Sequence, residues 1–178
     1  MKMAAYDNPM REVRLEKVVI NMGIGDKEDT YTNAKTLIEK LTGRSSIQTR
    51  SKKRAPEFKI RKDQVIGAMV TLRGQGATDM LKRALDANNN TLYESSVANN
   101  SLNFGVSEYI YFSGVKYDPK IGMMGLNLNA TFSRRGRRVE IRKRKAAKVA
   151  PEHRNIAPED IRKYIESKFG AKFVPREG

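Results

Sequence analysis

Apolar and polar residues alternate along several short stretches of this chain, and the alternation predicts β-strands. In residues 125–133 the apolar residues Leu126, Leu128, Ala130 and Phe132 alternate with Asn127, Asn129, Thr131 and Ser133. Because successive side chains on a strand point to opposite faces, this stretch predicts a strand with one buried and one polar face. Further strands are expected at residues 13–22, 45–50, 65–73 and 104–112.

Apolar residues at helical spacing predict three helices. The first covers residues 26–41 and is followed by a glycine, which favours the left-handed conformation that ends a helix. The second is expected to begin with Thr78 as its cap. The third begins at Pro158, a residue common in the first turn, and ends at Gly170. Residues 86–103 hold six asparagines and are expected to form a long surface loop.

Together these elements predict an α+β fold in which helices pack on one face of an antiparallel sheet. The length of 178 residues suits a single domain. The other face of the sheet would present polar side chains, namely those of Asn21, Thr71, Arg73, Asn127, Asn129 and Thr131. Half-buried strands commonly show polar residues to water, so this face acquires a functional meaning only from the segments that flank it.

The net charge is +15, and almost all of the excess lies in two segments. Residues 50–62, here called the basic arm, carry seven basic residues and one acid. Residues 134–148, here called the basic limb, carry nine basic residues and one acid. The rest of the chain is nearly neutral. Pro56 should keep the arm from forming a regular helix, and Val139 and Ile141 in the limb are expected to pair as a short edge strand.

Clustered positive charge on a neutral body favours nucleic acid as the partner, because neutralised phosphates release condensed counterions. A surface of amides and hydroxyls beside two cationic segments offers hydrogen bonds to ribose hydroxyls and base edges, as structured RNA requires. Tyr109 and Tyr111 are secondary candidates for stacking on bases. Charge alone does not separate RNA from DNA, so a general architectural protein for nucleic acid is an alternative. Attachment to an anionic membrane is another, although the basic segments have few apolar anchors.

Catalytic chemistry has little support in the sequence. The chain has no cysteine, which removes disulfides, thiolate metal sites and thiol nucleophiles and fits a reducing cytoplasm. Its one histidine, His153, lies in a polar segment, and the common catalytic and metal-binding motifs are missing. We therefore expect a protein without enzymatic activity, metal or cofactor.

Short motifs follow one another in a specific order along most of the chain. They are Asn21-Met22-Gly23-Ile24-Gly25, Leu41-Thr42-Gly43, Thr49-Arg50-Ser51-Lys52-Lys53, Ile66-Gly67-Ala68, Val70-Thr71-Leu72-Arg73, Asn103-Phe104-Gly105-Val106 and Tyr117-Asp118-Pro119. This combination, from residue 8 to residue 170, resembles the universal ribosomal protein L-five family, the large-subunit proteins that bind 5S rRNA. The basic extension after Ser133 resembles the archaeal and eukaryotic branch of the family.

The resemblance implies a structural constituent of the large ribosomal subunit, in the cytoplasm. Such a protein would bind 5S rRNA and attach it in the central protuberance, beside large-subunit rRNA and other central-protuberance proteins. It would also contact the P-site tRNA and a small-subunit bridge protein. The asparagine-rich residues 86–103 match no pattern of the family that we can carry over, so the bridge residues stay unassigned.

The resemblance and the charge pattern together nominate three groups of site residues. The 5S rRNA would be bound by Asn21, Arg44, Thr49, Arg50, Lys52, Lys53, Thr71 and Arg73. The loop facing the P-site tRNA would be residues 51–59, with Ser51, Lys52, Lys53, Arg54 and Lys59 as contacts. The basic limb would bind rRNA through Arg134, Arg135, Arg137, Arg138, Arg142, Lys143 and Arg144. Arg44 stands where many members of the family have glutamine, so a charged contact is expected there.

Overall fold

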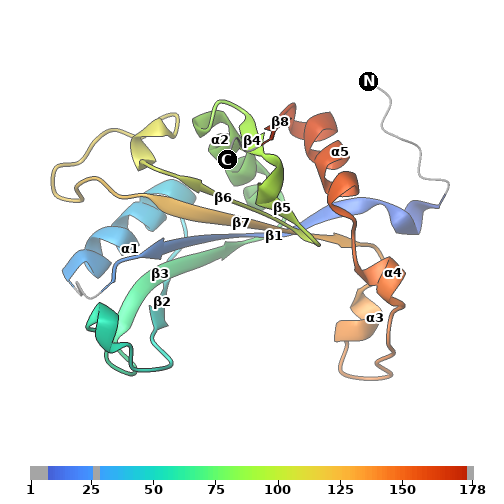
Figure 1. The fold of residues 1–178 in the computed structure, drawn as a ribbon, viewed down its shortest axis with the longest axis horizontal. Coiled ribbons are helices and arrows are strands. Elements are labelled where there is room, and N and C mark those ends of the chain that lie inside the picture. The colour runs from blue at the N-terminus through green and yellow to red at the C-terminus, as the bar shows by residue number, and fades with distance from the viewer. Residues whose placement is uncertain (1–7, 26–28, 176–178) are drawn as a thin grey trace.

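The computed structural model of the protein describes residues 8–25 and 29–175 and is built on a six-stranded sheet (Figure 1). The strands lie in the order β2 (Ile47–Arg50), β3 (Val65–Leu72), β1 (Val13–Gly23), β7 (Leu126–Arg134), β6 (Ser101–Val106) and β5 (Val97–Ala98). Every neighbouring pair in this sheet is antiparallel. The α+β fold predicted from the alternation is therefore confirmed.

Three helices pack on one face of the sheet: α1 (Asp29–Thr42), α2 (Gln75–Ala87) and α5 (Pro158–Phe169). The core between the layers buries large apolar side chains from both, including those of Ile20, Leu37, Leu81, Leu128, Phe132 and Ile165. The last helix has the predicted ends, because Pro158 opens it and Gly170 closes it with φ of 71°. Residues 26–28, the predicted start of the first helix, lie outside the described residues.

Short elements complete the fold. A separate two-stranded parallel sheet, which the sequence did not predict, joins β4 (Thr91–Tyr93) to β8 (Lys172–Val174). Single-turn helices lie at η1 (Pro9–Arg11), η2 (Pro56–Phe58), η3 (Glu94–Ser96) and η4 (Tyr109–Tyr111), and the short helices α3 (Arg138–Ile141) and α4 (Pro151–Arg154) follow β7.

The expectation of a long loop at residues 86–103 was wrong, because this stretch contains β4, η3, β5 and the start of β6. Ala98 pairs with Ser101, so Asn99 and Asn100 form a two-residue hairpin turn. The backbone of Asn100 is left-handed, with φ of 64°, as are those of Asn89 and Asn90. Asparagine tolerates this conformation better than most residues, and the asparagines therefore mark turns between short elements.

The strand predicted at residues 104–112 was also wrong in its second half. The strand β6 ends at Val106, and residues 109–111 form the turn η4. Tyr109 and Phe112 are buried, and the Tyr109 hydroxyl accepts a hydrogen bond from the backbone N–H of Asp118 at 2.9 Å. Three-residue spacing on a turn, rather than alternation on a strand, directs these two rings into the core.

Two further expectations are corrected by the structure. Val139 and Ile141 lie on the short helix α3 and not on an edge strand, because residues 137–140 make local backbone hydrogen bonds instead of extending β7. Thr78 does not cap the second helix, which begins at Gln75. Gly74, with φ of 64°, turns the chain sharply after β3 and starts this helix three residues earlier.

Candidate nucleic-acid interface

The face of the sheet opposite the three helices carries rows of polar side chains. Residues that pair across antiparallel strands present their side chains on the same face. Val19 of β1 pairs with Thr71 on one side and with Asn129 on the other, and Asn129 pairs with Asn103 of β6. A second row contains Met69, Asn21, Asn127 and Gly105. The predicted residues Asn21, Thr71, Asn127 and Asn129 therefore share this face, which we call the open face.

The amides and hydroxyl at the centre of the open face have no partners in the part of the chain that the structure describes. Asn127 is exposed, and Asn21, Thr71 and Asn129 are half-buried. None of these four side chains forms a hydrogen bond with another described residue. Their donors and acceptors are therefore available to a ligand, while the sheet beneath holds them in fixed positions.

The basic arm and the basic limb project from opposite ends of the sheet, on the side away from the helices (Figure 1). The arm joins β2 to β3, and the limb follows β7. The open face and the two extensions together form a concave outline in this view. Charge thus lies at both ends of an uncharged polar surface.

The arm is held in shape by its own backbone. The N–H of Ala55 donates to the carbonyl of Ile60 at 3.0 Å, and the reverse bond is 3.1 Å long. At the base, the N–H of Ser51 donates to the carbonyl of Gln64, and the Ser51 carbonyl accepts from Asp63. Pro56 begins the single turn η2, and the arm forms no longer helix, as predicted from this proline. The arm is therefore a folded loop.

The cations of the arm are exposed and have no carboxylate partner among the described residues. Lys52, Lys53, Arg54, Lys59, Arg61 and Lys62 all belong to this group. Arg50 donates to the side chain of Gln48, at 3.2 Å. Since no ion pair within the described residues must be broken, the whole positive charge of the arm can be directed to phosphates.

The exposure of two residues in the arm differs from what the sequence indicates. Ser51, proposed as a tRNA contact, is only 8% exposed, and its hydroxyl donates to the carbonyl of Lys53. Its hydroxyl therefore stabilises the loop. Phe58, which the sequence analysis did not single out, is 69% exposed among the lysines and arginines. An exposed aromatic ring inside a basic run was the signal that could have identified it as a stacking residue.

The base of the limb, unlike the arm, is tied to the body by ion pairs. Arg134 lies 3.0 Å from Asp160, with only 14% of its side chain exposed. Arg135 lies 3.1 Å from Glu12, and Arg137 lies 3.4 Å from Glu16. The remaining predicted residues, Arg138, Arg142, Lys143 and Arg144, are exposed and have no carboxylate partner among the described residues.

The other predicted residues lie around the edges of the open face or away from it. Thr49 on β2 pairs with Gly67, and Arg73 follows the end of β3. Arg44 is exposed between α1 and β2, where its N–H donates to the Thr42 hydroxyl at 3.2 Å. Arg73 therefore lies beside the base of the limb, at the other end of β3 from the arm. Arg44 lies in the connection before β2 and forms no ion pair with another described residue.

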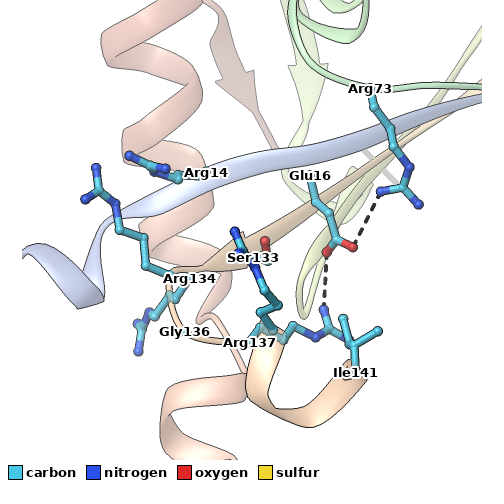
Figure 2. A pocket seen from close by; sticks show the side chains of 10 residues that line it. Arg14, Glu16, Arg73, Ser133, Arg134, Gly136, Arg137 and Ile141 are labelled. Carbon is cyan, nitrogen blue, oxygen red and sulfur yellow. Dashed lines mark hydrogen bonds and ion pairs between the residues drawn. The ribbon is translucent and has the colours of Figure 1, made fainter. Parts of the chain in front are cut away.

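A groove of about 690 Å³ lies where β1, β7 and the limb meet (Figure 2). It is lined by Arg14, Glu16, Arg73, Ser133, Arg134, Arg135, Gly136, Arg137, Arg138 and Ile141. Six arginines and one carboxylate thus line the groove, and of the six only Arg73 and Arg137 form ion pairs with Glu16. Glu16 reaches this position because the pairing of β1 with β7 shifts between Leu15 and Lys17, which leaves it as the extra residue of a β-bulge.

Features of a catalytic centre do not gather on this surface. The described part of the chain has no cluster of three or more residues suited to hold a metal ion. His153 lies 2.8 Å from the carbonyl of Arg135 through its Nε2, which must donate because the carbonyl can only accept. The exposed Tyr111 remains available for stacking on a base. Tyr109 is buried and is not available. Within the described residues, no helix is both long and apolar enough to cross a membrane.

Two models of one protein family match most of the chain, including the strands of the open face and both basic segments. Residues 8–61 match the family model described as Ribosomal protein L5, and residues 65–165 match the model of the C-terminus of the same ribosomal protein family. The boundary between the two matches falls at the end of the arm, and both parts contribute strands to the one six-stranded sheet.

Similar proteins come from archaea, and each bears the name Large ribosomal subunit protein uL5. The protein of Archaeoglobus fulgidus is 42% identical over 93% of both chains. That of Nanoarchaeum equitans is 37% identical over 94% of this chain and 99% of its own. That of Methanococcus vannielii is 40% identical over 93% of both. Since the matches extend from β1 through the open face and into α5, the chain belongs to the ribosomal protein L5 family.

Proposed function

We propose that this protein is a structural constituent of the large ribosomal subunit that binds 5S rRNA on its open face. The observation that carries the proposal is the set of unpartnered amides and hydroxyls lying between two cationic extensions on the same side of the sheet, within the described residues. The family consists of ribosomal proteins and not of enzymes. The relatives' name supports a place in the cytoplasmic ribosome, in contact with rRNA.

The parts of the interface would have different tasks. The side chains of Asn21, Thr71 and Asn129 can hydrogen-bond ribose hydroxyls and base edges, which identify RNA and its sequence. The cations of the arm and the exposed cations of the limb, Arg138, Arg142, Lys143 and Arg144, can neutralise phosphates, which supplies affinity for any nucleic acid. One chain, acting as a single RNA-binding unit, would thus combine selective and unselective contacts.

Two finer contacts are part of the same proposal. Residues 51–59 form the outer part of the arm and would reach the P-site tRNA, with Lys52, Lys53, Arg54 and Lys59 facing its phosphates. Phe58 adds an exposed ring that can stack on a nucleotide. A bridge to a small-subunit protein, and contacts with other proteins of the central protuberance, would use surfaces outside the open face.

The first experiment measures binding of 5S rRNA across a range of salt concentrations. Changing Lys52 and Lys53 together to alanine should weaken binding and lower the slope of log K against log salt by about 0.7–0.9 per lost phosphate contact. The matched control is the double change of Lys82 and Lys163, which are exposed on α2 and α5. An unchanged slope in the arm variant would argue against direct phosphate contacts there.

The second experiment separates selective RNA binding from general nucleic-acid binding. Duplex DNA and an unrelated folded RNA compete with labelled 5S rRNA in a filter-binding assay. Preference for 5S rRNA at constant salt supports the proposal. Comparable affinity for all three would instead favour a general architectural protein and overturn the specific role.

A further inference from the structure

We propose that the groove at the base of the limb binds a backbone phosphate of the RNA, and that Glu16 occupies the phosphate position in the free protein. This inference rests on the proposed function, because its ligand is the RNA. It adds a particular phosphate site and an internal competitor for it.

The bulge in β1 places the Glu16 carboxylate between two arginines from different parts of the chain (Figure 2). Its two oxygens lie 3.8 Å from Arg73, at the end of β3, and 3.4 Å from Arg137, in the limb. A carboxylate held between two guanidinium groups resembles, in charge and in acceptor oxygens, a phosphate bound by the same pair.

These contacts are weak enough to be exchanged. The Arg73 side chain is 60% exposed, and neither ion pair is as short as a good charge-assisted hydrogen bond. A phosphate offers more acceptor oxygens than a carboxylate, and arginine binds it in a bidentate manner. The arginines can therefore exchange Glu16 for RNA without loss of hydrogen bonds.

The groove also has donors that the protein does not use. The Nε of Arg137 is buried and has no hydrogen-bond partner within the described residues. Glu140 Oε2 lies 3.8 Å away, which is too far for a hydrogen bond, and it too has no hydrogen-bond partner there. Arg138, on the rim of the groove, forms no ion pair with another described residue. Buried groups without partners are uncommon in folded proteins, and a phosphate that draws the Arg137 side chain into the groove would supply a partner for its Nε.

The competition has a measurable consequence. When RNA enters the groove, the displaced carboxylate stays close to the incoming phosphate and repels it. Neutralising Glu16 should therefore strengthen RNA binding, although Glu16 makes favourable contacts in the free protein. It should also increase the number of phosphates that are effectively neutralised.

The test compares 5S rRNA binding by the wild-type protein, Glu16→Gln and Glu16→Asp. We expect Glu16→Gln to bind about fivefold to tenfold more tightly near 0.1 M salt, as removing one like charge at contact distance predicts. Its salt slope should steepen by about 0.7–0.9. Glu16→Asp keeps the charge and should bind like the wild type.

The matched control is Glu166→Gln, which makes the same change of net charge on α5. Glu166 is exposed and forms no ion pair with another described residue. Because α5 lies on the helix-covered side of the sheet, away from the open face, and salt screens the interaction of exposed charges, this change should alter binding less than about twofold. Circular dichroism of each variant verifies that it is folded under the conditions of the binding assay.

Three outcomes would overturn the inference. Glu16→Gln could bind no more tightly than the wild type, could match Glu166→Gln in affinity and slope, or could bind more weakly because Glu16 is needed to hold the limb. Failure of the proposed function has a different appearance. In that case the wild-type protein would bind 5S rRNA no more tightly than duplex DNA or an unrelated folded RNA, whatever Glu16→Gln does.

Discussion

Selective RNA recognition by the open face can be tested by removing one hydrogen-bonding group at a time. Thr71→Val keeps the shape of the side chain, and Asn21→Ala removes an amide from the next row. Neither side chain bonds to another described residue, so the free energy of unfolding should change by less than about 0.5 kcal/mol. In the complex, each change would leave an RNA group without its partner and cost about 1–3 kcal/mol. Affinity should therefore fall about 5-fold to 150-fold.

The assay is competitive binding of 5S rRNA against an unrelated folded RNA of similar length, at one salt concentration. The open-face variants should lose affinity for 5S rRNA and keep their affinity for the competitor. Thr32→Val, on the exposed side of α1, is the matched control and should lose neither. Equal losses for both RNAs, or no loss for either, would refute the view that these groups recognise the RNA.

Other parts of the chain give predictions of different kinds. Gly67→Ala would place a Cβ 2.6 Å from the carbonyl oxygen of Met22, so the free energy of unfolding, measured with urea, should fall by about 1–3 kcal/mol. Gly23→Ala is the control: nothing lies within 4 Å of its Cβ, and its free energy of unfolding should fall much less. Phe58→Ala should weaken binding of a tRNA by about 1–3 kcal/mol if the ring stacks on a base, and Phe58→Tyr should retain binding, which nucleotide titrations can measure. The hydrogen bond that Lys40 donates to Asp118, at 2.7 Å, lowers the pKa of this carboxyl from its usual value. The contact therefore stabilises the fold at neutral pH, and its contribution is lost as the pH falls through the lowered pKa. Lys40→Met should therefore lower the unfolding midpoint at neutral pH and converge with the wild type in strong acid.

Local patterns predicted the elements whose two faces differ most. Residues 125–133 alternate without exception, and β7 occupies Leu126–Arg134. The final helix was predicted at both ends, because Pro158 and Gly170 act through the backbone and require no knowledge of the rest of the fold. Sequence reasoning failed at residues 109–112, where burial of Tyr109 and Phe112 depends on a turn that packs against distant parts of the chain.

The sequence predicted the basic segments of the candidate interface but not the ion pairs that they form. Charge counting found both basic segments, because clustering along the chain is visible without a structure. It did not show that Arg134, Arg135 and Arg137 are partly neutralised, since their partners Glu12, Glu16 and Asp160 are far away in the sequence. Only the register of β1 against β7 brings Glu12 and Glu16 to the base of the limb.

The position of β1 in the middle of the sheet has a consequence for synthesis of the chain. The ribosome synthesises β1 long before β7, its neighbour in the sheet, since Asn21 pairs with Asn127 and Val13 pairs with Arg134. Until about a hundred further residues have been added, one edge of a strand that contributes Val13, Val18, Ile20 and Met22 to the core lacks its hydrogen-bonding neighbour. Contacts so distant in sequence slow folding and leave nascent chains prone to aggregation. Premature termination before residue 126 would therefore yield an aggregating fragment rather than a smaller folded protein.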